Sequence, residues 1–224
     1  PLSGTLAERI VAAPFLTDST AATARVADWL AALPPAEAAP VRALLSAHPT
    51  VKTLLESLSE SSPFLWELAS RDAVRLVAMM GAEPERHFSD LLAAKGTAAA
   101  EAIEIEDAML ILRRMKAEAA LLIALADIGG VWPVMQATHA LTDLADRAVD
   151  AAVRFALSEA ARAGRLQPKD KKNPNVDSGY IVLAMGKMGA FELNYSSDID
   201  LIVFFDPDTP ALPKDAEAAP TFVR

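Results

Sequence analysis

The sequence contains no cysteine, so disulfide bonds, thiolate metal sites and cysteine nucleophiles are excluded. It also lacks an apolar run long enough to cross a membrane, for which about 20 residues are needed. The most apolar stretch, residues 119–132, is interrupted by Asp127 and by Gly129 and Gly130. No basic segment followed by an apolar block marks an export signal at the N-terminus. These absences predict a reduced, cytoplasmic protein with no membrane partner.

Positive charge is also in short supply. Lysine and arginine number 21 against 30 aspartates and glutamates, which gives a formal net charge of −9. An acidic chain binds nucleic acid and anionic lipid poorly, so no nucleic-acid partner is expected. Hydrophobic residues, in contrast, make up 52% of the 224 residues. That is enough to bury a core in one large domain or two small ones.

Up to about residue 165 the sequence is typical of helices. Strong helix formers dominate it, and prolines separate the segments. We predict short helices near residues 5–12, 20–32, 36–46, 50–58, 63–69, 71–79 and 85–94. A longer helix at 98–128 has an apolar stripe at three- and four-residue steps, made of Ile105, Met109, Leu112, Met115, Ala119, Leu122 and Ala126. Another at 134–163 has a buried side made of Leu141, Leu144, Ala148, Ala152, Phe155 and Leu157.

The composition changes abruptly after this region. Residues 167–178 are polar and contain two prolines, which predicts a loop. Two nearly continuous apolar runs follow, at 180–185 and 199–205, and both favour strands buried on both faces. We therefore predict an α+β, predominantly helical protein, with a helical region at 1–133 and the start of a second domain at 134–224.

Two carboxylates, Asp198 and Asp200, stand at the head of the second predicted strand. Residues two apart in a strand point to the same face, so the two carboxylates are expected to project together. Such carboxylates repel each other unless a cation lies between them. Mg²⁺ is a hard cation that takes carboxylate oxygens and shares its remaining sites with water and substrate phosphates. The alternative is a pair of solvated acids at a strand edge.

A glycine turn, Gly186-Lys187-Met188-Gly189, follows the first predicted strand. Glycines let backbone amides approach a phosphate closely, and Lys187 adds a point charge, although many such turns are only tight loops. The spacing differs from that of a Walker A loop. A strand, a glycine turn and, twelve residues after Gly186, an Asp-x-Asp on the neighbouring strand form the layout of polymerase-β-type nucleotidyltransferases.

The segment Gly-Lys-Met-Gly-Ala-Phe-Glu-Leu-Asn-Tyr-Ser-Ser-Asp-Ile-Asp-Leu-Ile, residues 186–202, closely resembles the signature of the glutamine synthetase adenylyltransferase/adenylyl-removing enzyme family. Members of that family hold two nucleotidyltransferase domains in one long chain. Asn194 and the paired serines that follow resemble the N-terminal, adenylyl-removing copy. The chain departs from many members at Ala190, where they have a second glycine. The resemblance implies that the helical region leads into a truncated polymerase-β-type nucleotidyltransferase domain.

The resemblance also implies a reaction, phosphorolysis of an adenylyl-tyrosine on glutamine synthetase, which yields ADP and the free tyrosine. Asp198 and Asp200 would be the catalytic residues and the Mg²⁺ ligands. The residues implied to bind nucleotide and phosphate are Gly186, Lys187, Gly189, Ser196 and Ser197. An alternative role for the two serines is to cap the turn before the strand, and Asn194 either holds that turn or touches the nucleotide.

The implied partners follow from the same resemblance. Glutamine synthetase is the protein substrate, and ADP, ATP and phosphate are the small-molecule ligands. Full-length family enzymes also adenylylate glutamine synthetase with ATP and thereby regulate nitrogen assimilation. A PII-type signalling protein and glutamine are the implied regulators.

A third carboxylate, which polymerase-β-type sites take from a later strand, has no good candidate in the sequence. Only 24 residues follow Asp200, and Asp206 and Asp208 lie in the loop that leaves the same strand. We therefore expect the chain to be a fragment with an incomplete active site and little activity of its own.

Two other functions stay open at this point. The chain is either a nucleotidyltransferase with another acceptor or a non-catalytic helical module that binds a nucleotide or a partner. Separately, Lys169, Lys171 and Lys172 in the loop before the first strand are expected to be solvated, although a basic loop near a phosphate site steers anions.

Overall fold

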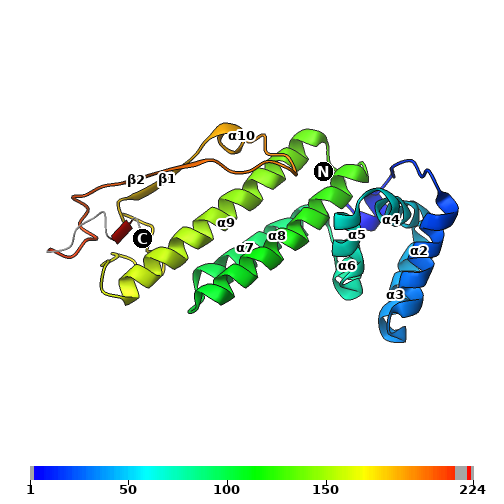
Figure 1. The fold of residues 1–224 in the computed structure, drawn as a ribbon, viewed down its shortest axis with the longest axis horizontal. Coiled ribbons are helices and arrows are strands. Elements are labelled where there is room, and N and C mark those ends of the chain that lie inside the picture. The colour runs from blue at the N-terminus through cyan, green and yellow to red at the C-terminus, as the bar shows by residue number, and fades with distance from the viewer. Residues whose placement is uncertain (1–2, 215–220, 223–224) are drawn as a thin grey trace. The chain divides into compact units, whose positions relative to one another are not determined.

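The computed structural model describes residues 3–214 and 221–222. These residues are mostly helical, with one two-stranded sheet near the C-terminus (Figure 1), which confirms the predicted α+β, mainly helical class. The helices are α1 (Leu6–Arg9), α2 (Ser19–Ala32), α3 (Pro35–Ala47), α4 (Pro49–Ser61), α5 (Pro63–Ser70), α6 (Ala73–Met80), α7 (Pro84–Ala100), α8 (Ile105–Ile128), α9 (Val134–Arg162) and α10 (Gly186–Gly189). The strands are β1 (Tyr180–Ala184) and β2 (Leu201–Phe205). No helix among the described residues is both long and apolar enough to span a bilayer.

The chain forms two compact units. Pro1–Leu91 and Lys116–Ala137 make up the first, and Leu92–Met115 and Thr138–Arg224 make up the second. Helices α7, α8 and α9 each contribute residues to both. The domain boundary predicted at residue 133 stays a prediction.

Side-chain caps and prolines start the helices of the first unit. Asp18 and Asp72 accept hydrogen bonds from backbone amides in the first turns of α2 and α6, which satisfies donors that a helix start leaves unpaired. Ser62 caps α5 in the same way, with Pro63 as its first residue. The sequence therefore specifies where these helices begin.

The second half of α8 forms the centre of the first unit. Six consecutive residues, 121–126, are all buried, so every side of the helix is covered there. Other large, fully buried side chains of the same unit come from α4 and α6: Leu54, Leu55, Leu58, Leu76, Met79 and Met80. The predicted stripe is confirmed in this half of the helix.

One ion pair ties the N-terminal residues to the start of α7. The guanidinium of Arg9 donates to both carboxylate oxygens of Glu85, at 2.6 and 2.8 Å, and the indole N–H of Trp132 donates to the same carboxylate at 2.7 Å. The hydrogen bonds from Arg9, aided by Trp132, lower the pKa of Glu85 to about 2. This carboxylate thus joins three separate segments of the first unit.

Small residues let α7 and α9 approach closely in the second unit. Ala99 and Ala100 of α7 form a buried cluster with Ala151 of α9. A Cβ at Gly96 would lie 2.5 Å from the side chain of Arg147, so the glycine leaves room for the arginine stem to cross α7. The close approach explains why a glycine lies inside this helix.

The two strands pair antiparallel, with Val182 opposite Val203. Residues opposite each other share a face, so Tyr180, Val182 and Ala184 lie on one face with Phe205, Val203 and Leu201. This face lies along α9 (Figure 1). At its end the rings of Tyr180 and Phe205 pack against that of Phe222 at tilted angles, with centroids 5.5 and 5.7 Å from it.

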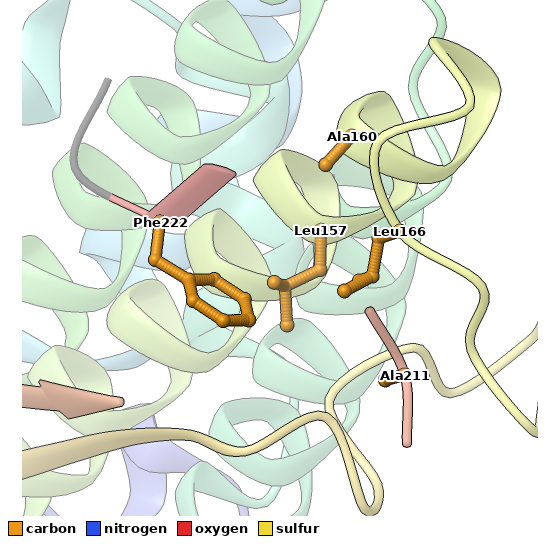
Figure 2. Packing of buried hydrophobic residues seen from close by; sticks show 5 residues of the cluster. All are labelled: Leu157, Ala160, Leu166, Ala211 and Phe222. Carbon is orange, nitrogen blue, oxygen red and sulfur yellow. The ribbon is translucent and has the colours of Figure 1, made fainter. Parts of the chain in front are cut away.

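Phe222 belongs to a compact apolar cluster at the C-terminal end of α9. The cluster consists of Leu157, Ala160, Leu166, Ala211 and Phe222 (Figure 2). Leu157 and Ala160 come from α9, whereas the other three come from the segments that precede and follow the hairpin. The cluster therefore fixes the end of the hairpin against the helix.

The expectation that both strands are buried on both faces is wrong for the described residues. The face away from α9, which contains Ile181, Leu183, Ile202 and Phe204, is about half exposed, from 41% at Ile202 to 51% at Phe204. On the face towards α9, Leu201 and Val203 are exposed as well, at 38% and 45%. A continuous apolar run predicts that both faces are covered, but α9 covers β1 better than β2.

Two features of the predicted long helices also differ. The helical structure is interrupted between Ala100 and Ile105. The segment predicted as one helix at 98–128 is therefore the end of α7, a short connection and then α8. Ile105 and Met109 are exposed, because the burial of α8 comes from the helices around its second half. In α9, Leu144, Phe155 and Leu157 are buried as predicted, whereas Ala152 is exposed and Leu141 and Ala148 are half-buried.

The ion pair predicts a specific pH dependence of stability. Because the pKa of Glu85 is about 2 in the folded protein and 4.5 otherwise, its contribution is complete above about pH 4.5 and disappears as the pH falls towards 2. Glu85→Gln is expected to lower the free energy of unfolding at pH 7 by about 1 kcal/mol, since the carboxylate is partly screened by solvent. Urea denaturation between pH 7 and 2.5 measures this difference.

The matched control is Glu67→Gln, which neutralises an exposed carboxylate of α5 in the same unit. It is expected to change stability by less than about 0.5 kcal/mol at every pH. If the difference in unfolding free energy between Glu85→Gln and the unmodified protein stays constant from pH 7 to 2.5, the assignment of this ion pair is contradicted.

Candidate active site

The glycine turn is a single helical turn, α10, directly after β1. Gly186 has a φ of +55°, a conformation that L side chains adopt at a cost. A Cβ at Gly189 would lie 2.5 Å from the carbonyl oxygen of Ala184, too close for any side chain. Gly186 is therefore required for its backbone conformation, and Gly189 is required because no side chain fits there.

The turn presents unused donors. Among the described residues, no backbone acceptor pairs with the amides of Gly186, Lys187 and Met188. The next amide, that of Gly189, already donates to the carbonyl of Met185 at 3.1 Å. The side chain of Lys187 is exposed. Consecutive free amides beside a lysine can bind phosphate oxygens.

Asp200 lies beside this turn. Its carbonyl accepts a hydrogen bond from the amide of Met185 at 2.9 Å, which continues the pairing of the hairpin one residue past β1. A Cβ at Gly186 would lie 3.5 Å from Oδ2 of Asp200, so the carboxylate reaches the turn. The hairpin thus joins two parts of the motif that are 14 residues apart in the sequence.

Asp198 lies two residues earlier, also exposed. The alternation of β2 puts Asp200 on the face of Ile202, away from α9. Asp198 precedes the strand, since β2 begins at Leu201. That both carboxylates project together as one metal site stays a prediction.

The residues present supply only some of the ligands that a hard cation such as Mg²⁺ needs. No group of three or more histidines, aspartates or glutamates gathers anywhere in the described residues. Two carboxylates are a donor set that Mg²⁺ accepts, because it completes its shell with water and phosphate oxygens. Asp206 lies at the opposite end of β2, where its amide donates to the carbonyl of Gly179, about 20 Å along the strand from Asp200.

A side-chain turn built on Asn194 leads into the acidic residues. Its Oδ1 accepts hydrogen bonds from the hydroxyls of Ser196 and Ser197, at 3.3 and 2.8 Å, and from the amide of Ser196 at 3.2 Å. This is the capping role expected as one of the two alternatives for the serines. Each hydroxyl has one proton, so it must rotate away from Asn194 before it donates to a phosphate. Their phosphate-binding role stays a prediction.

The loop between the turn and the acids is anchored on α9. Met188 and Leu193 are 3% and 4% exposed. The ring of Phe191 packs on that of His139, with centroids 5.9 Å apart. These anchors were not identified from the sequence, since the motif gives no sign of which helix supports it.

A polar cavity of about 300 Å³ lies between α9 and the start of the sheet. Asp146, Asp150 and Asn175 contribute its polar groups, and Ala184, Met188 and Leu201 line it from the side of the motif. Burial, followed by the nearby charge of Asp143, raises the pKa of Asp146. The sequence signal for these residues is weak, because one-turn spacing of acids is common on solvated helices.

Comparisons with known proteins find similarity to one enzyme family over nearly the whole chain. Residues 41–224 match the family described as glutamate-ammonia ligase adenylyltransferase. A relative from Rhodopseudomonas palustris (strain HaA2), a bifunctional glutamine synthetase adenylyltransferase/adenylyl-removing enzyme, is 51% identical over 219 residues. That alignment covers 98% of this chain and 22% of the relative.

Relatives from other organisms give the same result. Enzymes with the same description from Bradyrhizobium sp. (strain BTAi1) and Xanthobacter autotrophicus are 50% and 46% identical, over 98% and 95% of this chain and 22% and 21% of their own. The chain therefore spans about a fifth of the length of these relatives. No solved structure matches it.

The space requirement at Gly189 leads to a prediction. Gly189→Ala is expected to open the turn, because its methyl group would contact the carbonyl of Ala184 at 2.5 Å. Such overpacking costs about 1–3 kcal/mol, so amide hydrogen exchange of residues 184–192 is expected to rise by at least about fivefold. Exchange measured by mass spectrometry on this peptide tests it.

The matched control is Gly164→Ala, where φ is +71° and no atom lies within 4 Å of the added methyl group. It introduces backbone strain without a clash and is expected to leave exchange at 184–192 unchanged. Equal exchange in Gly189→Ala and in the unmodified protein would show that the turn tolerates a side chain.

Proposed function

Because the chain belongs to the glutamate-ammonia ligase adenylyltransferase family, we propose that it is part of the adenylyl-removing half of such an enzyme. In this half, AMP is removed from an adenylyl-tyrosine of glutamine synthetase by phosphorolysis. The match of the chain to the N-terminal copy of the signature, with Asn194 followed by two serines, supports the removing reaction over the adenylylating one.

The observation that carries the proposal is the position of Asp200 beside the glycine turn. The free amides of residues 186–188 suit phosphate oxygens, and the carboxylate of Asp200 reaches Gly186. An anion-binding turn next to a metal-binding carboxylate is the combination that phosphoryl chemistry needs. A solvated acid pair on a tight loop would not require Gly186 and Asp200 to meet.

The proposed reaction is an in-line displacement at the phosphorus of the adenylyl group. An oxygen of inorganic phosphate forms the new bond to phosphorus, and the bond to the tyrosine oxygen breaks. ADP results, and the phenolate of the tyrosine takes a proton from solvent. Mg²⁺, when bound, neutralises the charge that develops on the attacking and leaving oxygens.

The residues of this chain have three roles in that scheme. Asp198 and Asp200 would hold the metal ion. The amides of the turn and the ammonium group of Lys187 would bind and orient the phosphates, which keeps the reacting atoms in line. The turn built on Asn194 would fix the position of the acidic segment.

The site is incomplete in this proposal. Polymerase-β-type sites use a third carboxylate, and no group of three residues that could hold a metal ion gathers among the described residues. We expect it to come from residues after Arg224, so that the 224-residue chain alone has little activity. Glutamine synthetase as substrate, ADP, ATP and phosphate as ligands, and a PII-type protein and glutamine as regulators belong to the proposal for the whole enzyme. A cytoplasmic location belongs to it as well.

The test measures ADP release from adenylylated glutamine synthetase in the presence of Mg²⁺ and phosphate. It uses both the 224-residue chain and a polypeptide of the relatives' full length that includes it. Asp198→Asn and Asp200→Asn are expected to lower kcat of the longer polypeptide at least about 100-fold, since each removes a metal ligand worth several kcal/mol. The short chain is expected to release little ADP.

Asp208→Asn is the matched control, because it neutralises an exposed aspartate at the other end of the same hairpin. Its kcat is expected to stay within about threefold of the unmodified enzyme. If Asp198→Asn and Asp200→Asn are as active as this control, the assignment of the site is wrong. If no polypeptide releases ADP, a non-catalytic binding module is the better description.

A further inference from the structure

A second cavity lies in the second unit, at the C-terminal end of α9. It has a volume of about 600 Å³, within the range of sites that hold small organic ligands. The last turns of α9 form one wall, with Ser158 and Ala161, and the loop from Leu166 to Pro174 forms the other. Ala100 at the end of α7 and Glu101 just after it also line the cavity.

The charged side chains of this cavity are mostly positive. Arg154, Arg162, Lys171 and Lys172 line it, against the single carboxylate of Glu101. The whole chain has a net charge of −9, so this concentration of cations runs against the composition. A concave surface of one sign attracts small ions of the other sign.

Two of the cations are engaged in part. Arg162 donates to Glu159 at 2.7 Å, and its place in the last turn of α9 also suits the helix dipole. Arg154 is mostly buried and donates to the carbonyl of Lys172 at 3.1 Å, with Asp150 at 3.9 Å. Its Nε–H is buried and has no acceptor among the described residues.

The two lysines are exposed and lie outside the helix, where its dipole has no effect. Lys172 lies near Asp170: the hydrogen bond from Asn173 and, to a smaller extent, the charge of Lys172 lower the pKa of that carboxyl. Arg154 holds the carbonyl of Lys172 against α9. This contact attaches the loop that carries both lysines to α9, beside the cavity.

This cavity is separate from the acidic site. The loop of the acidic site is anchored near His139, whereas the cavity begins at Arg154 and extends past Ser158. Nineteen residues of α9 separate His139 from Ser158, which corresponds to about 28 Å along the helix axis. Figure 1 shows α10 and the end of α9 at opposite ends of the hairpin.

We propose that this cavity binds the phosphate group of a small molecule, separately from the site of Asp198 and Asp200. The lysines and Arg154 would bind the phosphate oxygens, and Ser158 and Gln167 offer further polar contacts. A half-open hollow of about 600 Å³ lined by several cations suits a compact dianion, whose charge is concentrated on a few oxygens. The proposal does not rest on the proposed function.

The test measures binding of ADP and inorganic phosphate by calorimetry, with EDTA present so that no metal ion assists the acidic site. Both are expected to bind, and inorganic phosphate is expected to compete with ADP, whereas adenosine, which lacks phosphate, is not. Lys171→Ala combined with Lys172→Ala is expected to weaken ADP binding at least about tenfold, since each removes a charge-assisted hydrogen bond.

The matched control is Lys169→Ala combined with Lys214→Ala, which removes two exposed lysines of the same unit from outside the cavity. Its ADP affinity is expected to change less than about threefold. Equal weakening in the two double variants would overturn the proposal, because it would show attraction to net charge alone. The proposal is also overturned if neither ADP nor phosphate binds, or if adenosine binds as tightly as ADP. Binding of citrate, tested as a second polyanion, without binding of phosphate would overturn it as well.

Discussion

The antiparallel pairing of β1 with β2 is the interaction on which the candidate active site depends. It brings the carbonyl of Asp200 to the amide of Met185 and so places the acidic segment next to the glycine turn. Shifting the register by one residue would turn Asp200 towards α9 and Leu201 away from it. In the observed register Tyr180, Val182 and Ala184 of β1 turn towards α9, and Phe222 packs on the end of the hairpin.

Helix α9 supports both ends of this arrangement. Near its start, His139 packs against Phe191 of the motif loop, and towards its end Leu157 and Ala160 hold the far end of the hairpin. The same helix lines the polar cavity under the sheet and the basic cavity at its C-terminus. The candidate active site at one end of the hairpin and the basic cavity at the other are thus supported by the same rigid helix, as precise sites generally require.

The sequence predicts local features of this protein better than long-range ones. Ser62 followed by Pro63 predicts a helix start because the cap involves only neighbouring residues. The glycines of the turn are identifiable for the same reason. In contrast, the exposure of Ile105 and of Phe204 depends on which segments cover them, and a hydrophobic pattern does not contain that information. The support of the motif by His139 was missed because 47 residues separate His139 from Gly186 in the sequence.

The open face of the hairpin has a consequence for handling the protein. Ile181, Leu183, Ile202 and Phe204 form a half-exposed apolar surface, and each strand pairs on only one side within the described residues. A two-stranded ribbon of this kind is marginally stable in water, and its unpaired backbone groups are templates for strands of other molecules. At high concentration, intermolecular strand addition therefore competes with the monomeric form, and the negative net charge opposes it by repulsion. High salt, which screens that repulsion, favours aggregation of this chain.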